Sequence, residues 1–334
     1  MIKGILFFII LIFSIINIDK DVERLEVEQI KREKTKELHY YKVINSNYKS
    51  NSETLLNIIN PFSGYIIADY YIGSEIQDEK VDINLDNKQN LEDIVNYDII
   101  NDKSIIMCQV NKLKYFVENI LPKINSKVIL ITGQNQLPQV NKSTITDKII
   151  YNPNIILWFS QNPLYEYRNV SKYNVFPYGL RHDKCFEYYK FLISNKDVEK
   201  SLNISNLYCT TWDHLPHNHI RKLYPIFSKE KKLHYKDYLT KISKSKYLIS
   251  PTGDRDDCYR HYEAIGLNTI PISNTGFLYK KIFDDNMLYL DIIDILKAIK
   301  YGKVIHEFKE PNRDIITTTY WKEWINKIIY PQIK

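Results

Sequence analysis

Small residues are scarce in this chain of 334 residues, which has 9 glycines and only three alanines. Isoleucine, lysine, asparagine and tyrosine take their place, and the codons of all four are rich in A and T. We interpret the 27 tyrosines as coding bias, so a single tyrosine or lysine carries little functional weight. With 44% hydrophobic and 26% charged residues, the composition excludes a disordered or collagen-like chain.

Cysteine is also sparse, and no C-x-x-C pair occurs, which argues against a structural zinc site. The even number permits disulfides without implying them. Three histidines, His214, His217 and His219, have loose metal-ligand spacing, but Pro216 among them favours a loop. We therefore predict no protein-bound metal. The four cysteines are Cys108, Cys185, Cys209 and Cys258.

No concentrated basic segment occurs, although the net charge is +6. Lysine and arginine are spread along the chain among 40 acidic residues, and no nucleic-acid-binding motif is present. Nucleic-acid binders usually gather their basic residues on one face or helix. The sequence therefore predicts no nucleic-acid partner, and its mild positive charge is compatible with a small anionic ligand.

One long apolar run, Gly4–Ile18, stands at the N-terminus and is followed by charged residues. It is short for a membrane span of about 20 residues, and no small-residue cleavage site follows it. We predict that 1–18 is an uncleaved signal anchor, with a cleaved signal peptide or a buried helix as alternatives. The charged segment 19–50 predicts a helical stalk. These features predict a single-pass type II membrane protein, with its folded part on the lumenal side of the Golgi or endoplasmic reticulum.

Short apolar runs alternate with helical patterns along the rest of the chain. Such alternation favours βαβ units with parallel sheets. At roughly 150 residues per domain, we expect two α/β domains, at 51–198 and 199–334. The predicted strands are 104–110, 128–132, 155–159, 174–177, 207–210, 247–250 and 269–272. The predicted helices are 111–121, 220–228, 235–243, 258–267, 292–301 and 321–329.

The most informative segment is 246–274, KYLISPTGDRDDCYRHYEAIGLNTIPISN. A buried-strand pattern meets a turn around Gly253, and Asp256 or Asp257 is a suitable helix N-cap. Asn268 stands where a left-handed residue would end the helix. The segment therefore predicts a strand, a tight loop, a helix and a second strand. A helix N-terminus behind such a loop can bind phosphate.

On this helix, Asp257, Arg260 and Glu263 fall on one face at a spacing of three residues. Arg260 could hold a diphosphate through two hydrogen bonds, and Glu263 could accept hydrogen bonds from a ribose diol. A chain of surface ion pairs is the alternative interpretation of the same spacing.

The segment resembles the signature of exostosin-like glycosyltransferases, the family 47 type that includes the ribitol xylosyltransferase branch. Their pattern is roughly S-P-x-G-x-x-x-D-x-x-R-x-x-E-A. It is matched here from Ser250 to Ala264, and 269–271 follows as in the family. Upstream, Trp158–Asn162 is similar to W-F-x-Q-N, and Phe176–Leu180 is similar to I-P-x-G-L. The matches extend over about 126–290.

The resemblance implies a GT-B-like fold, in which two Rossmann-like domains face a cleft. It implies an inverting glycosyltransferase that moves a sugar from a nucleotide-diphosphate sugar, a UDP-sugar first, to a glycan or glycoprotein acceptor. The C-terminal domain would bind the nucleotide sugar through Gly253, Asp257, Arg260 and Glu263, with Arg221 as a second cation. An inverting enzyme needs a general base. The candidates are Asp69, His182 and Asp183.

The chain departs from the family pattern at four positions. Thr252 stands where the family often has arginine. Arg255 stands where the family often has glycine, and it could supply that cation from three residues on. Asn268 replaces a frequent glycine. Gln136 replaces a frequent aspartate, which leaves a non-catalytic, membrane-anchored glycan- or nucleotide-binding relative as the alternative function. The segment 254–256 has the D-x-D pattern, which we interpret as helix capping. We therefore predict that no cofactor is required, with a bound divalent cation as the alternative.

Overall fold

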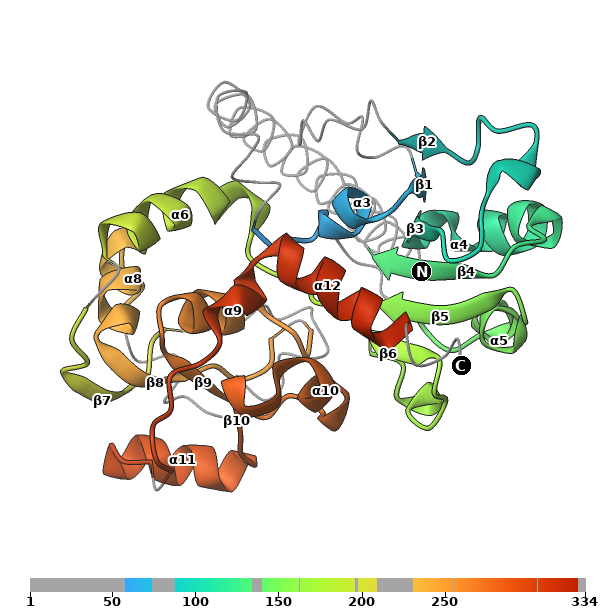
Figure 1. Ribbon diagram of the computed structural model, residues 1–334. Coiled ribbons are helices and arrows are strands. Elements are labelled where there is room, and N and C mark those ends of the chain that lie inside the picture. The colour runs from blue at the N-terminus through green and yellow to red at the C-terminus, as the bar shows by residue number, and fades with distance from the viewer. Residues whose placement is uncertain are drawn as a thin grey trace, which may run out of the picture. The chain divides into compact units, whose positions relative to one another are not determined.

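The computed structural model describes residues 58–73, 88–133, 140–161, 163–195, 198–208, 231–253, 255–304 and 306–329 (Figure 1). The predicted anchor at 1–18, the predicted stalk at 19–50, Gln136, Arg221 and the three histidines lie outside these ranges. Within them, no helix is both long and apolar enough to span a membrane. The chain is a mixed α/β protein with two parallel sheets.

The first sheet has six parallel strands in the order β2-β1-β3-β4-β5-β6. Its central strands, β3, β4 and β5, are almost entirely buried. Such apolar runs are typical of parallel strands that are covered on both faces. The predictions of β3 to β6 are confirmed. The strands are β1 (Tyr70–Ile72), β2 (Gln89–Asn90), β3 (Ile105–Gln109), β4 (Val128–Gly133), β5 (Ile155–Ser160) and β6 (Tyr173–Val175).

The second sheet has four parallel strands in the order β10-β9-β8-β7. The strands predicted at 247–250 and 269–272 correspond to β8 and β9. Of the strand predicted at 207–210, Leu207 and Tyr208 are not in a strand, and 209–210 lie outside the described residues. The edge strand β7 lies earlier in the chain and has two exposed residues. The strands are β7 (Leu202–Ser205), β8 (Ser245–Ile249), β9 (Ile270–Ser273) and β10 (Leu288–Tyr289).

Three predicted helices flank the second sheet. They are α8 (Tyr235–Ser243), α9 (Tyr259–Gly266) and α11 (Ile292–Tyr301). The helix predicted at 111–121 lies within a continuous helical segment of mixed type. It consists of a 3-10 turn (Val110–Lys112), α4 (Leu113–Tyr115), a π-helix (Phe116–Ile120) and a second 3-10 turn (Leu121–Lys123). The sequence did not predict α3 (Ser63–Ile67), α5 (Thr144–Tyr151), α6 (Cys185–Ser194) or α10 (Lys280–Phe283).

The last helix, α12 (Thr318–Ile329), returns to the first sheet (Figure 1). Its Trp324 ring contacts Phe159 of β5, with ring centroids 5.7 Å apart. Just before it, the backbone N–H of Ile59 donates to the carbonyl of Ile316 at 2.9 Å. All described residues belong to one compact unit. The division into two domains at residue 198 therefore stays a prediction, and its second part includes a helix that packs on the first sheet.

Candidate functional site

The segment that connects β8 to β9 forms the predicted strand, loop, helix and strand. The backbone N–H of Gly253 donates to the carbonyl of Arg255 at 2.9 Å, which closes the loop tightly. The predicted N-cap at Asp256 or Asp257 is wrong, because Cys258 is the N-cap and forms a capping box with His261. The prediction for Asn268 is confirmed, since its φ of 58° is left-handed. The helix is buried on more sides than predicted, from His261 to Gly266.

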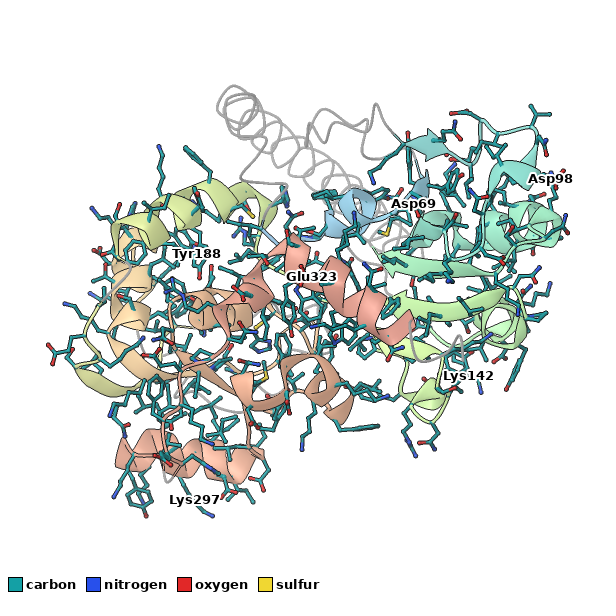
Figure 2. The ribbon with its side chains drawn as sticks, in the orientation of Figure 1. Asp69, Asp98, Lys142, Tyr188, Lys297 and Glu323 are labelled. Carbon is teal, nitrogen blue, oxygen red and sulfur yellow. The ribbon has the colours of Figure 1, made fainter. Side chains whose placement is uncertain are left out.

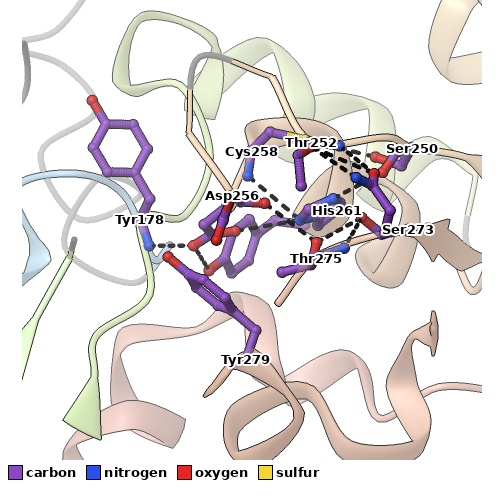
Figure 3. A network of polar contacts seen from close by, with 12 residues as sticks. Tyr178, Ser250, Thr252, Asp256, Cys258, His261, Ser273, Thr275 and Tyr279 are labelled. Carbon is purple, nitrogen blue, oxygen red and sulfur yellow. Dashed lines mark hydrogen bonds and ion pairs between the residues drawn. The ribbon is translucent and has the colours of Figure 1, made fainter. Parts of the chain in front are cut away.

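Asp257 lies at the centre of a buried polar network in this loop, part of which is shown in Figure 3. Its side chain accepts a hydrogen bond of 2.8 Å from the backbone N–H of Tyr178 and one of 2.6 Å from the Tyr262 hydroxyl. Only 2% of the residue is exposed. A surface ion-pair chain is therefore excluded for Asp257. Its carboxylate instead joins the turn after β6 to helix α9.

His261 balances the charge of Asp257. Its Nδ1 lies 3.4 Å from Oδ1 of Asp257, and its Nε2 lies 3.1 Å from the carbonyl of Ser250. Burial by itself lowers the pKa of this imidazole, but the neighbouring Cys258 sulfur and Asp257 carboxylate raise it to about 10. The charged form of His261 is thereby favoured beside Asp257, and the two side chains form a buried pair under the loop.

Glu263 is also buried, with 6% of the residue exposed. Its two carboxylate oxygens accept hydrogen bonds from the hydroxyls of Tyr235 and Tyr238, at 2.9 and 2.7 Å. Burial raises the pKa of Glu263. The two hydroxyls and the positive charges of Arg260 and Arg181 oppose that rise. The carboxylate that was expected to receive a ribose diol thus holds two hydroxyl groups of the protein itself.

Arg260 connects α9 to the residues after β7. Its Nη2 donates to the carbonyl of Tyr208 at 2.6 Å and its Nη1 to that of Leu207 at 3.5 Å. Its guanidinium also lies over the ring of Tyr238, 5.8 Å from the centroid. Arg260 and Glu263 therefore both contact Tyr238, which agrees with their predicted position on one face of the helix.

Arg255 has the most unusual surroundings of the predicted cations. Only 5% of the residue is exposed, and its guanidinium lies 4.2 Å above the ring of Tyr178. Its Nη1 is buried and has no hydrogen-bond partner among the residues that the structure describes. A buried donor without a partner is costly. An oxyanion is the ligand that such a group binds most strongly.

The candidate bases lie in two separate segments, with Asp69 before β1 and His182–Asp183 in one turn after β6. Asp69 is exposed and precedes β1 (Figure 2), where its carboxylate accepts from the backbone N–H of Ile105 at 2.8 Å. It therefore lies at the amino ends of β1 and β3. Ligands of parallel sheets usually bind at the carboxyl ends, so this position does not favour Asp69.

His182 and Asp183 lie in the turn that leads from Leu180 into α6. The ring of His182 packs edge-on against Phe62, with centroids 5.3 Å apart. Arg181 donates to both carboxylate oxygens of Asp183, at 2.9 and 2.6 Å. Because Nζ of Lys184 in the same turn lies 5.0 Å from the ring of Tyr235, whose hydroxyl donates to Glu263, this turn is close to the α9 network.

The upstream motifs lie at the carboxyl ends of β5 and β6. Gln161 donates to the carbonyls of Pro61 and Pro177, at 3.0 and 3.4 Å. Gly179 has a φ of 81°, and a Cβ there would lie 2.4 Å from the backbone of Ile59. These residues therefore shape the turn that carries Tyr178 to Asp257 and Arg255.

Sequence reasoning missed Tyr178, Tyr235 and Tyr238, because the tyrosines were attributed to coding bias. The spacing of Tyr235 and Tyr238 on a predicted helix was the available signal. Among the described residues, no three histidine, cysteine, aspartate or glutamate side chains are grouped as metal ligands. No family model matches the sequence, and a search of curated proteins finds no significant match.

Proposed function

We propose that this protein is an inverting glycosyltransferase of the exostosin-like type. It transfers a sugar from a nucleotide-diphosphate sugar to a glycan or glycoprotein acceptor. In this proposal the two parallel sheets belong to the Rossmann-like halves of a GT-B arrangement. The C-terminal half binds the donor and the N-terminal half binds the acceptor. Two parallel sheets with charged groups after β8 support this assignment, because such sheets bind ligands beyond their carboxyl ends.

The buried guanidinium of Arg255 is the observation that carries the proposal. Its unpartnered Nη1 belongs to the loop that precedes the N-terminus of α9, where the helix dipole favours an anion. A diphosphate supplies several oxyanions, and a guanidinium binds them bidentately. Gly253 keeps the loop compact, and Arg221 is proposed as a further cation.

The proposed chemistry is a single displacement at the anomeric carbon. A general base takes the proton of the acceptor hydroxyl. The oxygen of that hydroxyl bonds to the anomeric carbon from the face opposite the leaving group. The bond to the diphosphate breaks, and the nucleoside diphosphate leaves with the electron pair. Arg255 and Arg260 offset the charge that develops on it. His182 or Asp183 is the proposed base, because the turn that carries them adjoins the α9 network.

The proposed setting is the lumenal face of a membrane, with the apolar run at 1–18 as the anchor. Expression of the full chain, followed by alkaline carbonate extraction, tests this part separately. Retention in the membrane pellet is expected. Release into the supernatant would contradict the anchor and leave the transferase proposal standing.

Donor binding is the direct test of the proposed function. We expect one member of a panel of UDP- and GDP-sugars to raise the thermal midpoint, because ligand at 100 times its dissociation constant adds about 2.7 kcal/mol to stability. Arg255→Gln should weaken that binding by about tenfold or more. Arg168→Gln, at an exposed position, is the matched control and should leave it unchanged. No stabilisation by any sugar nucleotide, or equal binding by both variants, would contradict the assignment of the site.

A further inference from the structure

Two phenol groups from one turn of α8 meet on one buried carboxylate. The Tyr235 hydroxyl donates to Oε1 of Glu263 at 2.9 Å, and the Tyr238 hydroxyl donates to Oε2 at 2.7 Å. Their rings are nearly parallel, with centroids 6.0 Å apart and an interplanar angle of 18°. A spacing of three residues places both rings on the same face of the helix. Each oxygen of Glu263 therefore has its own hydroxyl donor.

A sugar diol binds a carboxylate in the same way, because its two O–H groups donate to the two carboxylate oxygens. A carboxylate can accept about four hydrogen bonds, but Glu263 is only 6% exposed. Little of its surface is open to another ligand while the tyrosines are in place. A diol that reaches Glu263 must therefore replace at least one of the two hydroxyls.

We infer that Tyr235 and Tyr238 occupy the place of a ligand diol on Glu263 and exchange with it when the ligand binds. The inference rests on the proposed function and assigns the diol to the ribose of the donor nucleotide. A buried carboxylate without partners would be unfavourable, and the tyrosines satisfy it in the empty protein. The exchange keeps Glu263 hydrogen-bonded in both states. It also reduces the apparent affinity, because ligand binding must break bonds that already exist.

Cations next to the two rings connect this exchange to the phosphate end of the ligand. Nζ of Lys184 lies 5.0 Å from the centroid of the Tyr235 ring, and the Arg260 guanidinium lies 5.8 Å from that of Tyr238. A cation over an aromatic face stabilises the position of the ring. Phosphate oxygens attract the same cations more strongly. A bound diphosphate would thus loosen the tyrosines while the ribose competes for Glu263.

The test compares uridine diphosphate with its 2′-deoxy analogue by calorimetry, for the wild type and for Tyr238→Phe. Tyr238→Phe removes one of the bonds that the ribose must displace, so it should bind uridine diphosphate about tenfold tighter. The deoxy analogue, which lacks one ribose hydroxyl, should gain much less. Tyr301→Phe, at a position 68% exposed, should change neither affinity. Tyr235→Phe provides a second variant in case Tyr238→Phe does not fold.

A gain in affinity distinguishes exchange from a purely structural role, which predicts unchanged or weaker binding. If both tyrosine variants bind uridine diphosphate no tighter than the wild type, or if the deoxy analogue gains equally, the exchange is wrong. The binding of uridine diphosphate itself would then still support the proposed function. If neither nucleotide binds the wild type or the variants, the inference is wrong, and the donor panel decides whether the proposed function fails with it.

Discussion

The carboxyl ends of the two sheets differ in the charge of the side chains gathered there. In the first sheet, β3 ends in Gln109 and β5 is followed by Gln161, both neutral and buried. After β8 in the second sheet come Arg255, Asp257 and His261, which are equally buried. A buried charge needs a partner, whereas a buried amide needs only hydrogen bonds. This difference in charge supports the proposal that the second sheet binds the nucleotide diphosphate.

The largest expected effect is a loss of stability, which should be greater when a charged residue at the edge of the second sheet is replaced than when a neutral one at the edge of the first sheet is. Asp257→Ala should destabilise the protein by about 3–5 kcal/mol, because it removes the buried carboxylate that accepts from Tyr178 and Tyr262 and faces the His261 ring. Gln161→Ala removes hydrogen bonds to two carbonyls and should cost about 1–3 kcal/mol. Urea unfolding of both variants measures the difference. Equal losses would mean that the charge of Asp257 contributes nothing beyond its hydrogen bonds.

Alkaline pH should lower the free energy of unfolding through buried tyrosines around the second sheet. Burial, followed by nearby charge, raises the pKa of Tyr188, Tyr238 and Tyr262 well above the ordinary value of 10.0. Groups whose folded pKa is raised stabilise the protein fully below pH 10, and this contribution is lost as the pH rises further. The free energy of unfolding should therefore fall above about pH 10, by up to about 1.4 kcal/mol per pH unit for each tyrosine.

Tyr188→Phe tests this assignment, because it removes one titrating group from the folded protein. Its unfolding free energy should start slightly lower, since the hydroxyl donates to the carbonyl of Glu263 at 2.9 Å, and should decline less steeply with pH. Urea unfolding at several alkaline pH values gives both slopes. A variant that declines as steeply as the wild type would show that Tyr188 does not contribute.

A smaller effect is expected at the glycine of the turn between the sheets. Gly179→Ala combines a left-handed φ of 81° with a Cβ 2.4 Å from the Ile59 backbone, and should cost about 2–4 kcal/mol. Gly302 is the matched control, since its φ is 60° and a Cβ there would meet nothing within 4 Å. Gly302→Ala should cost only about 1 kcal/mol. Thermal unfolding measures the loss of stability in both variants. Similar losses would mean that the left-handed φ accounts for the cost and that the close approach of the Ile59 backbone adds nothing.

The smallest expected effect is a gain. Asn268 has a φ of 58°, and its buried Oδ1 has no hydrogen-bond partner among the described residues. Asn268→Gly should therefore stabilise the protein by about 0.5–1 kcal/mol. The thermal midpoint would rise by a few degrees or less. A lower midpoint would show that the asparagine side chain makes a contribution that its position after α9 does not reveal.

The sequence was most informative about the fold where apolar runs were long. The strands β4 and β5 and the helices α8 and α11 were predicted nearly to the residue, because their patterns are continuous. The edge strand β7 was not predicted, since its four residues, Leu-Asn-Ile-Ser, alternate and contain no continuous apolar run. The segment around α4 was predicted as one uniform helix and is helical throughout, but helical periodicity does not reveal its local changes between 3-10, α and π hydrogen bonding.

The candidate site was predicted in its residue types and less well in their partners. The positions of Arg255 and Glu263 in one loop-helix unit follow from local spacing. Contacts from elsewhere in the chain, such as Tyr178 on Asp257 and Tyr238 on Glu263, depend on tertiary packing that no local pattern contains. The same limitation explains why Asp257 was predicted as a helix N-cap but is a link between two parts of the chain.

The return of α12 to the first sheet has a consequence for biosynthesis. Phe159 of β5 meets Trp324, so this side chain receives part of its cover only after residue 324 has left the ribosome. N-terminal regions often fold during synthesis, yet here the first sheet would wait, incompletely covered, until α12 has been synthesised. Chaperone protection of the nascent chain would therefore matter most during translation of the second sheet.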